Sequence, residues 1–490
     1  MGDGMGERQV SLDRRTENLI IWTLLLASFV VILNETIMSV ALPTLMTELH
    51  VSATSVQWVT TGFMLTMSVV IPTTGFLQER LTTRTVFLLS MSLFSLGTLL
   101  GATAANFGFL VGARVVQACG TAIMLPLLTT TILVIVPVER RGRVMGMISV
   151  VISLAPALGP TVSGFILQYF SWRWLFWLML PIALLMLGVG YTRMVSLGQS
   201  RRVPLDVASV VLSVFGFGGL VYGFSELGSP TRSVPVIVVS LVVAAVGLVA
   251  FVRRQAVLVR RDQAFLDLGT FAVPNFRLAI GILCVTFAAL IGVSLLWPIF
   301  LQQVRMVSPV MTGLMLLPGG LAMGVAGPLI GRLFDRFGAR VLVVPAASLL
   351  VVMLVLMGFS SARTPLLVLV LFHLLFSGSL SFVFTPTFTG GLNDLPPHQY
   401  SHGSALFGAL QQVAGAGGTA LLVSIMAARR TSLMAVGVDA AAGTRGGVQW
   451  ALWAAALLSV TAVVMATRLR RSGAPQEHAP AVRAIAAVEH

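Results

Sequence analysis

The sequence contains little charge and no lysine. Of its 490 residues only 10% are charged, 57% are apolar, and all 31 basic residues are arginine. The mean hydropathy is +0.95. Soluble globular domains carry about 25% charged residues. The composition therefore excludes an ordinary soluble domain and predicts a protein built largely inside a membrane.

Cysteine is also scarce, and the usual catalytic patterns are missing. The two cysteines, Cys119 and Cys284, both fall in apolar runs, so they provide neither a disulfide framework nor metal-ligand spacing. The sequence has no Walker motif, no nucleophile elbow, and no dinucleotide fingerprint between a strand and a helix. We therefore expect no enzyme activity, no metal site, no cofactor and no direct use of ATP.

Long apolar runs recur from near residue 19 to near residue 467. A helix needs about 20 apolar residues to cross about 30 Å of hydrocarbon. We predict an all-α membrane protein with about fourteen spans. They are placed at 19–42, 54–78, 85–104, 107–136, 144–168, 174–194, 205–226, 234–252, 278–302, 312–331, 340–360, 365–388, 403–427 and 448–467.

The arginines are spread unevenly over the predicted connections. With both termini inside, the inner connections and tails hold 23 arginines and the outer ones seven, which leaves Arg114 within a span. This positive-inside pattern predicts a multi-pass protein of a bacterial cytoplasmic membrane with both termini in the cytoplasm. The net charge of +14 therefore reflects topology. A nucleic-acid partner would require arginines gathered on one soluble face, so we expect none.

Two inner connections repeat each other. Gly75–Arg84 and Gly331–Arg340 both read Gly-x-Leu-x-acid-Arg-x-x-x-Arg. A parallel duplication of a six-span unit, with two extra spans inserted between the copies, accounts for the repeat and the span count. The predicted division is a tail at 1–18, a six-helix bundle at 19–194, two inserted helices and a linker at 195–277, a second six-helix bundle at 278–467, and a disordered tail at 468–490.

The repeated connection resembles the inner-loop signature of the major facilitator superfamily, with Glu79 in place of the usual Asp in the first copy. Arg114–Ala122 resembles its fourth-span motif Arg-x-x-Gln-x-x-Gly, and Gly146–Gly164 is similar to its antiporter motif in the fifth span. Leu33–Pro43 is similar to a first-span motif of the fourteen-span drug/proton antiporters, the multidrug-resistance exporters. In this chain Asn34 stands at the position of that motif's Asp, and Glu35 follows it.

This resemblance implies a major facilitator fold and a set of conformational residues. It implies that the inner-loop residues latch the two halves together, although their arginines fit a purely topological role as well. The fifth-span glycines fit either a sliding interface between the halves or static close packing, with the glycines of 319–328 as the partner surface. The conformational residues are Glu79, Arg80, Arg84, Gly159, Pro160, Gly164, Asp335, Arg336 and Arg340.

Glu35 is the only carboxylate placed deep inside an apolar run, and a buried acid in a membrane is a functional candidate. Glu35 and Arg114 each lie about 10 Å below the outer edge of the predicted spans, so we expect them to pair and to couple protons to transport. A structural ion pair without proton traffic is the alternative. Asn34, Met38, Ser39 and Gln117 are placed along the substrate path, and Asn34 fits equally well as a residue that preserves the volume of the family's Asp.

The functional hypothesis is a proton-coupled antiporter that exports amphipathic or cationic drug-like compounds by alternating access. Its partners are small-molecule substrates, protons and the lipid bilayer, and a monomer suffices. Two alternatives remain open. One is a dedicated exporter of a single native metabolite, lipid or antibiotic, and the other is a membrane sensor or scaffold that transports nothing.

Overall fold

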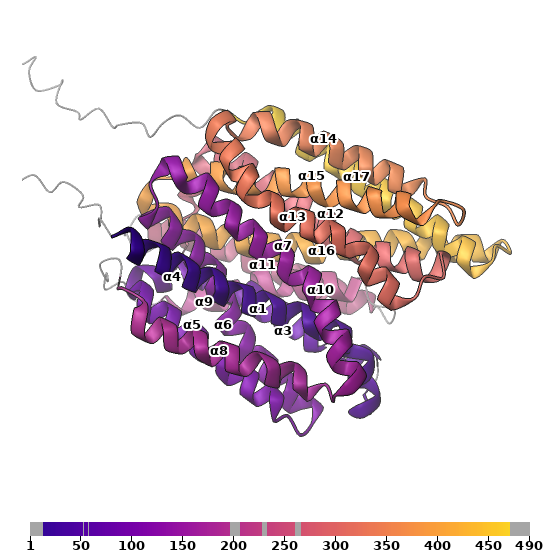
Figure 1. Cartoon of the computed structure of the whole chain (residues 1–490), viewed down its shortest axis with the longest axis horizontal. Coiled ribbons are helices and arrows are strands. Elements are labelled where there is room, and N and C mark those ends of the chain that lie inside the picture. The colour runs from indigo at the N-terminus through magenta and orange to yellow at the C-terminus, as the bar shows by residue number, and fades with distance from the viewer. Residues whose placement is uncertain are drawn as a thin grey trace, which may run out of the picture.

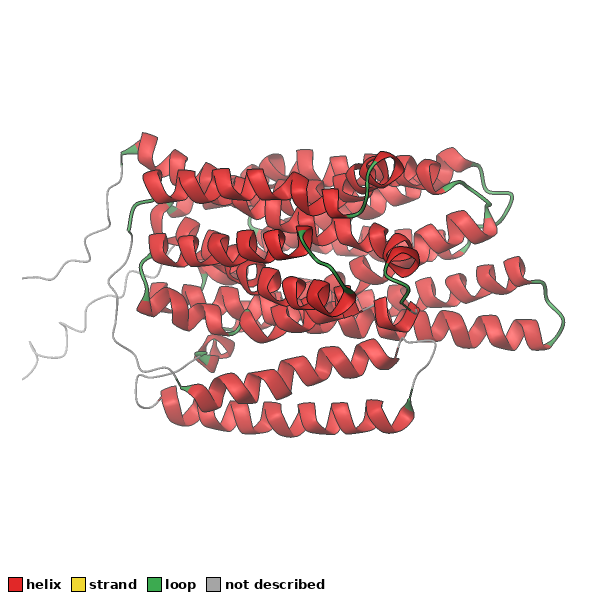
Figure 2. Ribbon diagram, turned by 90° about the horizontal axis from the view of Figure 1, so that it is seen from below, coloured by secondary structure: helices red, strands yellow, loops and turns green. Residues whose placement is uncertain are grey.

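The computed structural model describes residues 13–51, 53–56, 58–196, 206–227, 233–259 and 266–470, and every regular element within these ranges is a helix (Figure 2). The all-α prediction is confirmed for this part of the chain. The α-helices are α1 (Arg14–Glu48), α2 (Ala53–Val56), α3 (Trp58–Val70), α4 (Thr73–Arg80), α5 (Thr83–Ala102), α6 (Phe107–Ile135), α7 (Val138–Tyr169), α8 (Arg173–Arg193), α9 (Val207–Ser213), α10 (Gly219–Leu227), α11 (Val234–Val259), α12 (Pro274–Ile299), α13 (Pro309–Phe337), α14 (Ala339–Gly358), α15 (Leu366–Asn393), α16 (Tyr400–Ala435) and α17 (Ala440–Thr467). The short turns are the π-helical η1 (Val214–Gly218) and η3 (Phe300–Val304) and the 3-10 helical η2 (Leu268–Ala272) and η4 (Pro397–Gln399).

Judged by length and apolarity, the described helices give fewer candidate membrane spans than the predicted fourteen. Twelve helices in the described ranges are long and apolar enough to cross a membrane. α3 and α4 together make a thirteenth, bent by 51° where Pro72, which has no backbone N–H, precedes α4. The 32-residue α7 is not among them. The count of fourteen is therefore not confirmed.

The helices form two bundles that lie side by side (Figure 1). The first bundle contains α1 to α8 and the second contains α12 to α17, and α7 of the first packs along α13 of the second. α9, η1, α10 and α11 form an inserted hairpin behind the line where the bundles meet, and Figure 2 shows it as a separate layer on one side of the molecule.

Both ends of the described chain lie at one end of the bundles, which we call the inner end. Glu17 near the start of α1 pairs with Arg140 at the start of α7, with 3.5 Å between Oε1 and Nη2. The backbone N–H of Arg470, beyond α17, donates to Oδ1 of Asn275 at the start of α12 (3.0 Å). Both ends of a membrane protein lie on the same side when the number of spans is even.

The first helix starts earlier than the predicted span, since α1 begins at Arg14 and the span was placed from residue 19.

Close contact between α5 and α6 fixes the interior of the first bundle. The Ser90 hydroxyl donates to the carbonyl of Gly120 (2.7 Å), and a Cβ at Gly120 would lie 2.4 Å from the Ser90 carbonyl oxygen. A Cβ at Gly97 would lie 2.4 Å from the backbone nitrogen of Gln117. Glycine alone permits this approach, as is common where membrane helices meet. The contact sets the position of Gln117, which belongs to the buried polar chain described below.

We expect Gly120→Ala to lower the thermal unfolding midpoint of the detergent-purified protein. The added methyl group overpacks the α5–α6 contact, which costs about 1–3 kcal/mol. Gly112→Ala in the same helix is the matched control, because nothing lies within 4 Å of a Cβ there and the gain in helix propensity is the same. Equal midpoints for the two variants would show that the contact is looser than described.

Candidate functional site

Arg114 of α6 is a buried cation whose polar contacts are to neutral groups. Only 1% of its surface is exposed. Nη1 donates to Oδ1 of Asn34 on α1 (3.0 Å) and to Oε1 of Gln117 (2.5 Å), and Nε donates to the carbonyl of Val59 on α3 (3.5 Å). The guanidinium carbon lies 4.0 Å from the centre of the Phe63 ring. Neutral oxygens and an aromatic face thus offset part of the large cost of burying the charge.

The contacts of Arg114 extend into a chain of hydrogen bonds across three helices. Nε2 of Gln117 donates to Oγ1 of Thr98 on α5, and that hydroxyl donates to the carbonyl of Phe94, both at 2.7 Å. Asn34, Gln117 and Thr98 are fully buried. Nδ2 of Asn34 is buried and has no hydrogen bond within the described residues. The chain fixes α1, α5 and α6 to one another at the depth of Arg114.

The predicted ion pair between Glu35 and Arg114 is not formed. Arg114 takes Asn34 as its partner on α1, and Glu35 makes no ion pair or hydrogen bond with any residue that the structure describes. The two charges still interact electrostatically through space. The sequence-based prediction was therefore right that α1 and Arg114 meet and wrong about the residue that makes the contact.

Helix geometry explains the change of partner. Consecutive residues of an α-helix point about 100° apart. Asn34 faces α6, while Thr36 faces α7, where a Cβ at Gly159 would lie 2.3 Å from the Thr36 hydroxyl oxygen. Glu35 therefore points between α6 and α7. It is half-buried, as is Thr36, whereas Asn34, Ile37 and Met38 are buried, so the Glu35 side chain is less tightly packed than those three.

The remaining predicted substrate residues fall into two groups. Met38 is 1% exposed and belongs to the apolar core. Gln117 uses both ends of its amide inside the protein. The side chains of Ser39 and Pro160 lie outside the described part of the structure. Substrate contact by these residues stays a prediction.

Two acids of the repeated connections contact the opposite bundle at the inner end. Oε1 of Glu79 on α4 lies 2.8 Å from Nε2 of His402 on α16. Oδ1 of Asp335 on α13 accepts a hydrogen bond from the backbone N–H of Gly142 on α7 (3.1 Å). Each acid therefore joins the two bundles directly, as a latch requires.

Arg141 makes a further contact between the bundles. It lies at the start of α7, is 8% exposed, and donates from Nη1 to the hydroxyl of Tyr400 (3.1 Å) and to Oδ1 of Asn393 (3.3 Å) in the second bundle. Its Nε and Nη2 donate to the carbonyls of Val136 and Leu133 at the end of α6 (3.0 and 2.5 Å). A cation is favoured there because the carbonyls of a helix C-terminus carry partial negative charge.

Glycines bring α7 and α13 into backbone contact near the same end. A Cβ at Gly331 would lie 2.0 Å from the carbonyl oxygen of Gly142, and a Cβ at Gly146 would lie 2.2 Å from that of Gly327. The predicted pairing of fifth-span glycines with the 319–328 region is confirmed at Gly146. Farther along α7, Gly159 packs on α1 of its own bundle, and Gly164 has nothing within 4 Å of its Cβ position.

The arginines of the repeated connections make their described contacts within their own bundles. Arg84 donates to the carbonyl of Tyr191 on α8 (2.5 Å) and lies over its ring. Arg80 and Arg336 lie over the rings of Phe76 and Phe337 on their own helices, and Arg340 is exposed. The two acids, Glu79 and Asp335, bridge the bundles.

Sequence reasoning missed His402 and Arg141 as residues of the inner contacts. Their partners are 323 and 259 residues away in the chain, and no local pattern encodes such a distance. Within the described ranges, no three His, Cys, Asp or Glu side chains gather as a metal ion would need.

Comparisons with known proteins agree with the fold and the motifs. The family model of the Major Facilitator Superfamily matches residues 24–419. The uncharacterized MFS-type transporter YcnB of Bacillus subtilis (strain 168) is 39% identical over 95% of this chain and 97% of its own length. The lincomycin resistance protein LmrB of the same organism is 39% identical over 84% of this chain and 86% of its own. The crystal structure of the human organic anion transporter MFSD10 superimposes with a TM-score of 0.65 at 17% identity, covering 92% of this chain and 99% of that one.

We expect Gln117→Leu to destabilise the protein through Arg114. The substitution removes one acceptor from the guanidinium and the donor to Thr98, and a hydrogen bond to a charged group contributes about 1.5–3 kcal/mol. Thermal unfolding in detergent measures the effect. Val115→Leu on the exposed side of the same helix is the control and should leave the midpoint unchanged. A Gln117→Leu midpoint equal to that of the parent would argue against the chain of hydrogen bonds described above.

Proposed function

This chain belongs to the Major Facilitator Superfamily, and from that premise we propose that it is a proton-coupled antiporter. It exports amphipathic, drug-like compounds from the cytoplasm by alternating access of a site between the two bundles. It acts in a bacterial cytoplasmic membrane with both termini in the cytoplasm. The proton gradient supplies the energy.

The observation that carries the proposal is the state of Glu35 beside Arg114. Glu35 has a half-buried carboxyl without a hydrogen bond or ion pair in the described structure, one residue from the Asn34 that holds Arg114. A carboxyl in that position binds or releases a proton without first breaking a contact. An acid inside a membrane helix is expensive to keep charged, so its proton occupancy responds strongly to whether water and Arg114 can reach it.

Arg114 provides the second state that coupling needs. Its acceptors on α1 and α6 are the neutral amides of Asn34 and Gln117. An ionised Glu35 would compete with Asn34 for the guanidinium, because a charged acceptor binds it more strongly than an amide does. Protonation of Glu35 returns Arg114 to the arrangement described above. The partner that Arg114 takes on α1 thereby follows the proton.

The inner contacts supply the gate in this scheme. Glu79 with His402, Asp335 with Gly142, and the Arg141 contacts hold the bundles together at the inner end. Loading of cargo from the cytoplasm requires these contacts to open, and release outside requires them to be closed. Because these polar contacts are few, the free energy of binding a proton or cargo can open or close them.

The proposed substrate class rests on the relatives and on side-chain chemistry. LmrB is named for resistance to lincomycin. The apolar core that spans the first bundle contains methionines such as Met38 and Met67 together with aromatic residues, and flexible thioethers accommodate varied apolar shapes. Because LmrB carries the name of one drug, a dedicated exporter with a narrow substrate range is the second candidate. Competition by a panel of unrelated cationic and neutral drugs separates the two, since a dedicated exporter responds to a narrow set.

We expect Glu35→Gln to abolish uphill export while cargo binding is retained. The amide preserves size and hydrogen-bonding capacity but cannot exchange a proton. Inverted membrane vesicles energised with a proton gradient measure drug uptake, and the collapse of the gradient on drug addition measures proton exchange. Both signals should fall at least tenfold.

Glu48→Gln, at the exposed end of the same helix, is the control and should transport like the parent. Unchanged gradient-driven uptake in Glu35→Gln would show that Glu35 is not the residue that couples protons to export. If the parent exchanges no protons for any drug in the panel, the transport proposal itself is wrong.

We expect Glu79→Ala to open the inner end more often. A Ser404→Cys reporter in a variant lacking Cys119 and Cys284 should react several times faster with a membrane-impermeant maleimide in inverted vesicles, because Ser404 is 3% exposed in the closed arrangement. Adding His402→Ala should change the rate little more, since both substitutions remove one contact. Gln78→Ala is the neighbouring control, and an equal rate in that variant would argue against a specific latch.

A further inference from the structure

The inserted hairpin touches both bundles along the line where they meet. On one side, the Tyr222 ring of α10 lies 5.8 Å from the Trp58 ring of α3 in the first bundle. On the other side, the Ser424 hydroxyl of α16 in the second bundle donates to the carbonyl of Leu227 at the end of α10 (3.4 Å). Any relative motion of the bundles therefore requires the hairpin to follow one of them and to move against the other.

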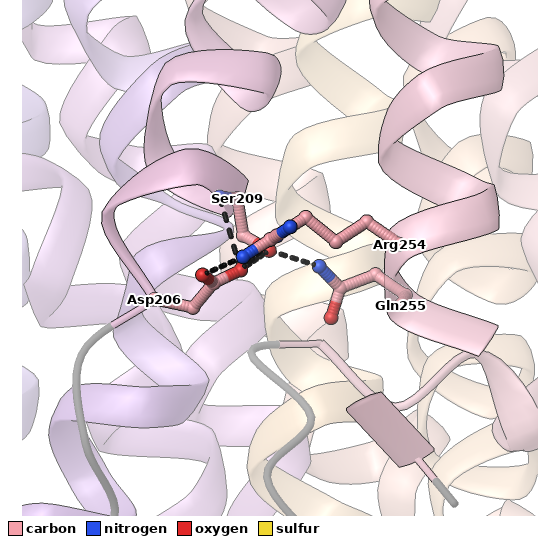
Figure 3. Close-up of polar contacts among 4 residues, drawn as sticks. All are labelled: Asp206, Ser209, Arg254 and Gln255. Carbon is pink, nitrogen blue, oxygen red and sulfur yellow. Dashed lines mark hydrogen bonds and ion pairs between the residues drawn. The ribbon is translucent and has the colours of Figure 1, made fainter. Parts of the chain in front are cut away.

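A polar clamp joins the two arms of the hairpin at the inner end (Figure 3). Arg254 of α11 donates from Nε and Nη2 to the two carboxylate oxygens of Asp206, each at 2.6 Å. Asp206 also caps α9 by accepting from the backbone N–H of Ser209 (3.1 Å), and Nε2 of Gln255 donates to the Ser209 hydroxyl (2.6 Å). Ser209 and Gln255 are fully buried. The arms therefore move as one unit.

The clamp stays charged under all cellular conditions. Hydrogen bonding from Arg254 is the main cause that lowers the pKa of Asp206 to about 2, below its ordinary 3.8. A lowered pKa means that the stabilisation is complete above the ordinary value and is lost only as the pH falls through about 2. A proton gradient that drives transport therefore leaves the clamp closed.

Hydrogen bonds continue from the clamp into the second bundle. Oε1 of Gln255 accepts from the backbone N–H of Leu266 (3.0 Å), which is fully buried ahead of α12. The next residue, Asp267, accepts from Gly269 through Oδ1 (2.7 Å) and from Nε2 of Gln399 through Oδ2 (2.6 Å). Gln399 directly precedes α16. The inner end of the hairpin is thus tied to the helix whose outer part bonds Leu227.

The described contacts of the hairpin with the first bundle are apolar or aromatic, unlike its hydrogen bonds to the second bundle. At Gly218 a Cβ would lie 3.2 Å from a methyl carbon of Val69 and 3.9 Å from Leu65 of α3, and the Trp58–Tyr222 pair is aromatic. In a bilayer such apolar contacts exchange for lipid with little change in free energy, whereas hydrogen bonds in the apolar interior have no water to replace them. The two sides of the hairpin therefore differ in how readily they slide.

We propose that the inserted hairpin is carried by the second bundle and slides along α3 of the first when the bundles rock, with Gln255, Asp267 and Gln399 as the positioning residues that attach it. The proposal rests on the alternating access proposed above.

Cross-linking tests the attachment in a variant lacking Cys119 and Cys284. One cysteine pair, Val69→Cys with Gly218→Cys, links the hairpin to the first bundle, and another, Leu227→Cys with Ser424→Cys, links it to the second. A short, reducible, bifunctional thiol reagent forms each link, and export is measured before and after reduction. The first link should lower export at least tenfold and reduction should restore it, whereas the second should change export less than twofold.

Export that survives the first link, or that is lost with the second, would overturn the proposal. If the reduced variants and the parent export nothing, the proposed function fails instead, so the two failures are distinguishable. Single-cysteine variants treated with the same reagent control for simple modification.

Spin-label distances test the positioning residues without a transport measurement. Labels at Val257→Cys on the hairpin and His398→Cys on the second bundle should give one narrow distance distribution that does not change with pH or drug. A label at Thr85→Cys on the first bundle should give a distance from Val257 that shifts by several ångström under the same conditions. Asp267→Ala and Gln399→Ala should each broaden the first distribution, because both remove the bond between Asp267 and Gln399. Adding Gln399→Ala to Asp267→Ala should broaden it little further, since Asp267→Ala already removes that bond together with the Gly269 contact. A shift confined to the Val257–His398 pair would mean that the hairpin belongs to the first bundle.

Discussion

The first bundle is arranged around a cation that touches no anion. Arg114 is buried at a depth where a charge is costly, and it is held by two amides, a carbonyl and an aromatic face. The helices that carry these groups must keep their positions, because otherwise the buried guanidinium loses its hydrogen-bond acceptors and its aromatic contact. α1, α3 and α6 are therefore tied to one side chain, and α5 joins them through the hydrogen bond from Gln117 to Thr98. Because the acceptors are neutral, the positive charge remains available to the nearby Glu35.

The contacts between the bundles have a different character, since they combine backbone packing with a small number of polar bonds. Gly142 and Gly331 bring α7 and α13 together without side chains between them, while Glu79 and His402 meet on the other flank. A hydrogen bond contributes about 0.5–1.5 kcal/mol net, so a few of them sum to a few kcal/mol. That is the range in which differential binding of a ligand shifts a two-state equilibrium. The polar contacts between the bundles are thus within the range that binding energy can open and close.

Much of this architecture follows from the sequence, and the exceptions have physical reasons. Apolar runs predict the helices, because hydrocarbon leaves the backbone no other partner, and the small residues of α7 and α13 predict their contact at Gly146. The partner of Arg114 was misassigned because a one-residue difference on a helix turns a side chain by about 100°, which a depth argument cannot resolve. His402 and Arg141 were missed because their partners come from the other bundle. The count of fourteen spans is not confirmed, because apolar composition does not show how a helix such as α7 is divided between membrane and inner connection.

The inserted hairpin lies over one flank of the line between the bundles, from Trp58 on one side to Ser424 on the other. A transporter made of two six-helix bundles has two lateral flanks facing the bilayer, and here one of them is covered by protein. The line between the bundles is therefore left facing the bilayer only on the flank where α7 packs on α13. The hairpin thus makes the two-bundle fold one-sided towards the lipid phase.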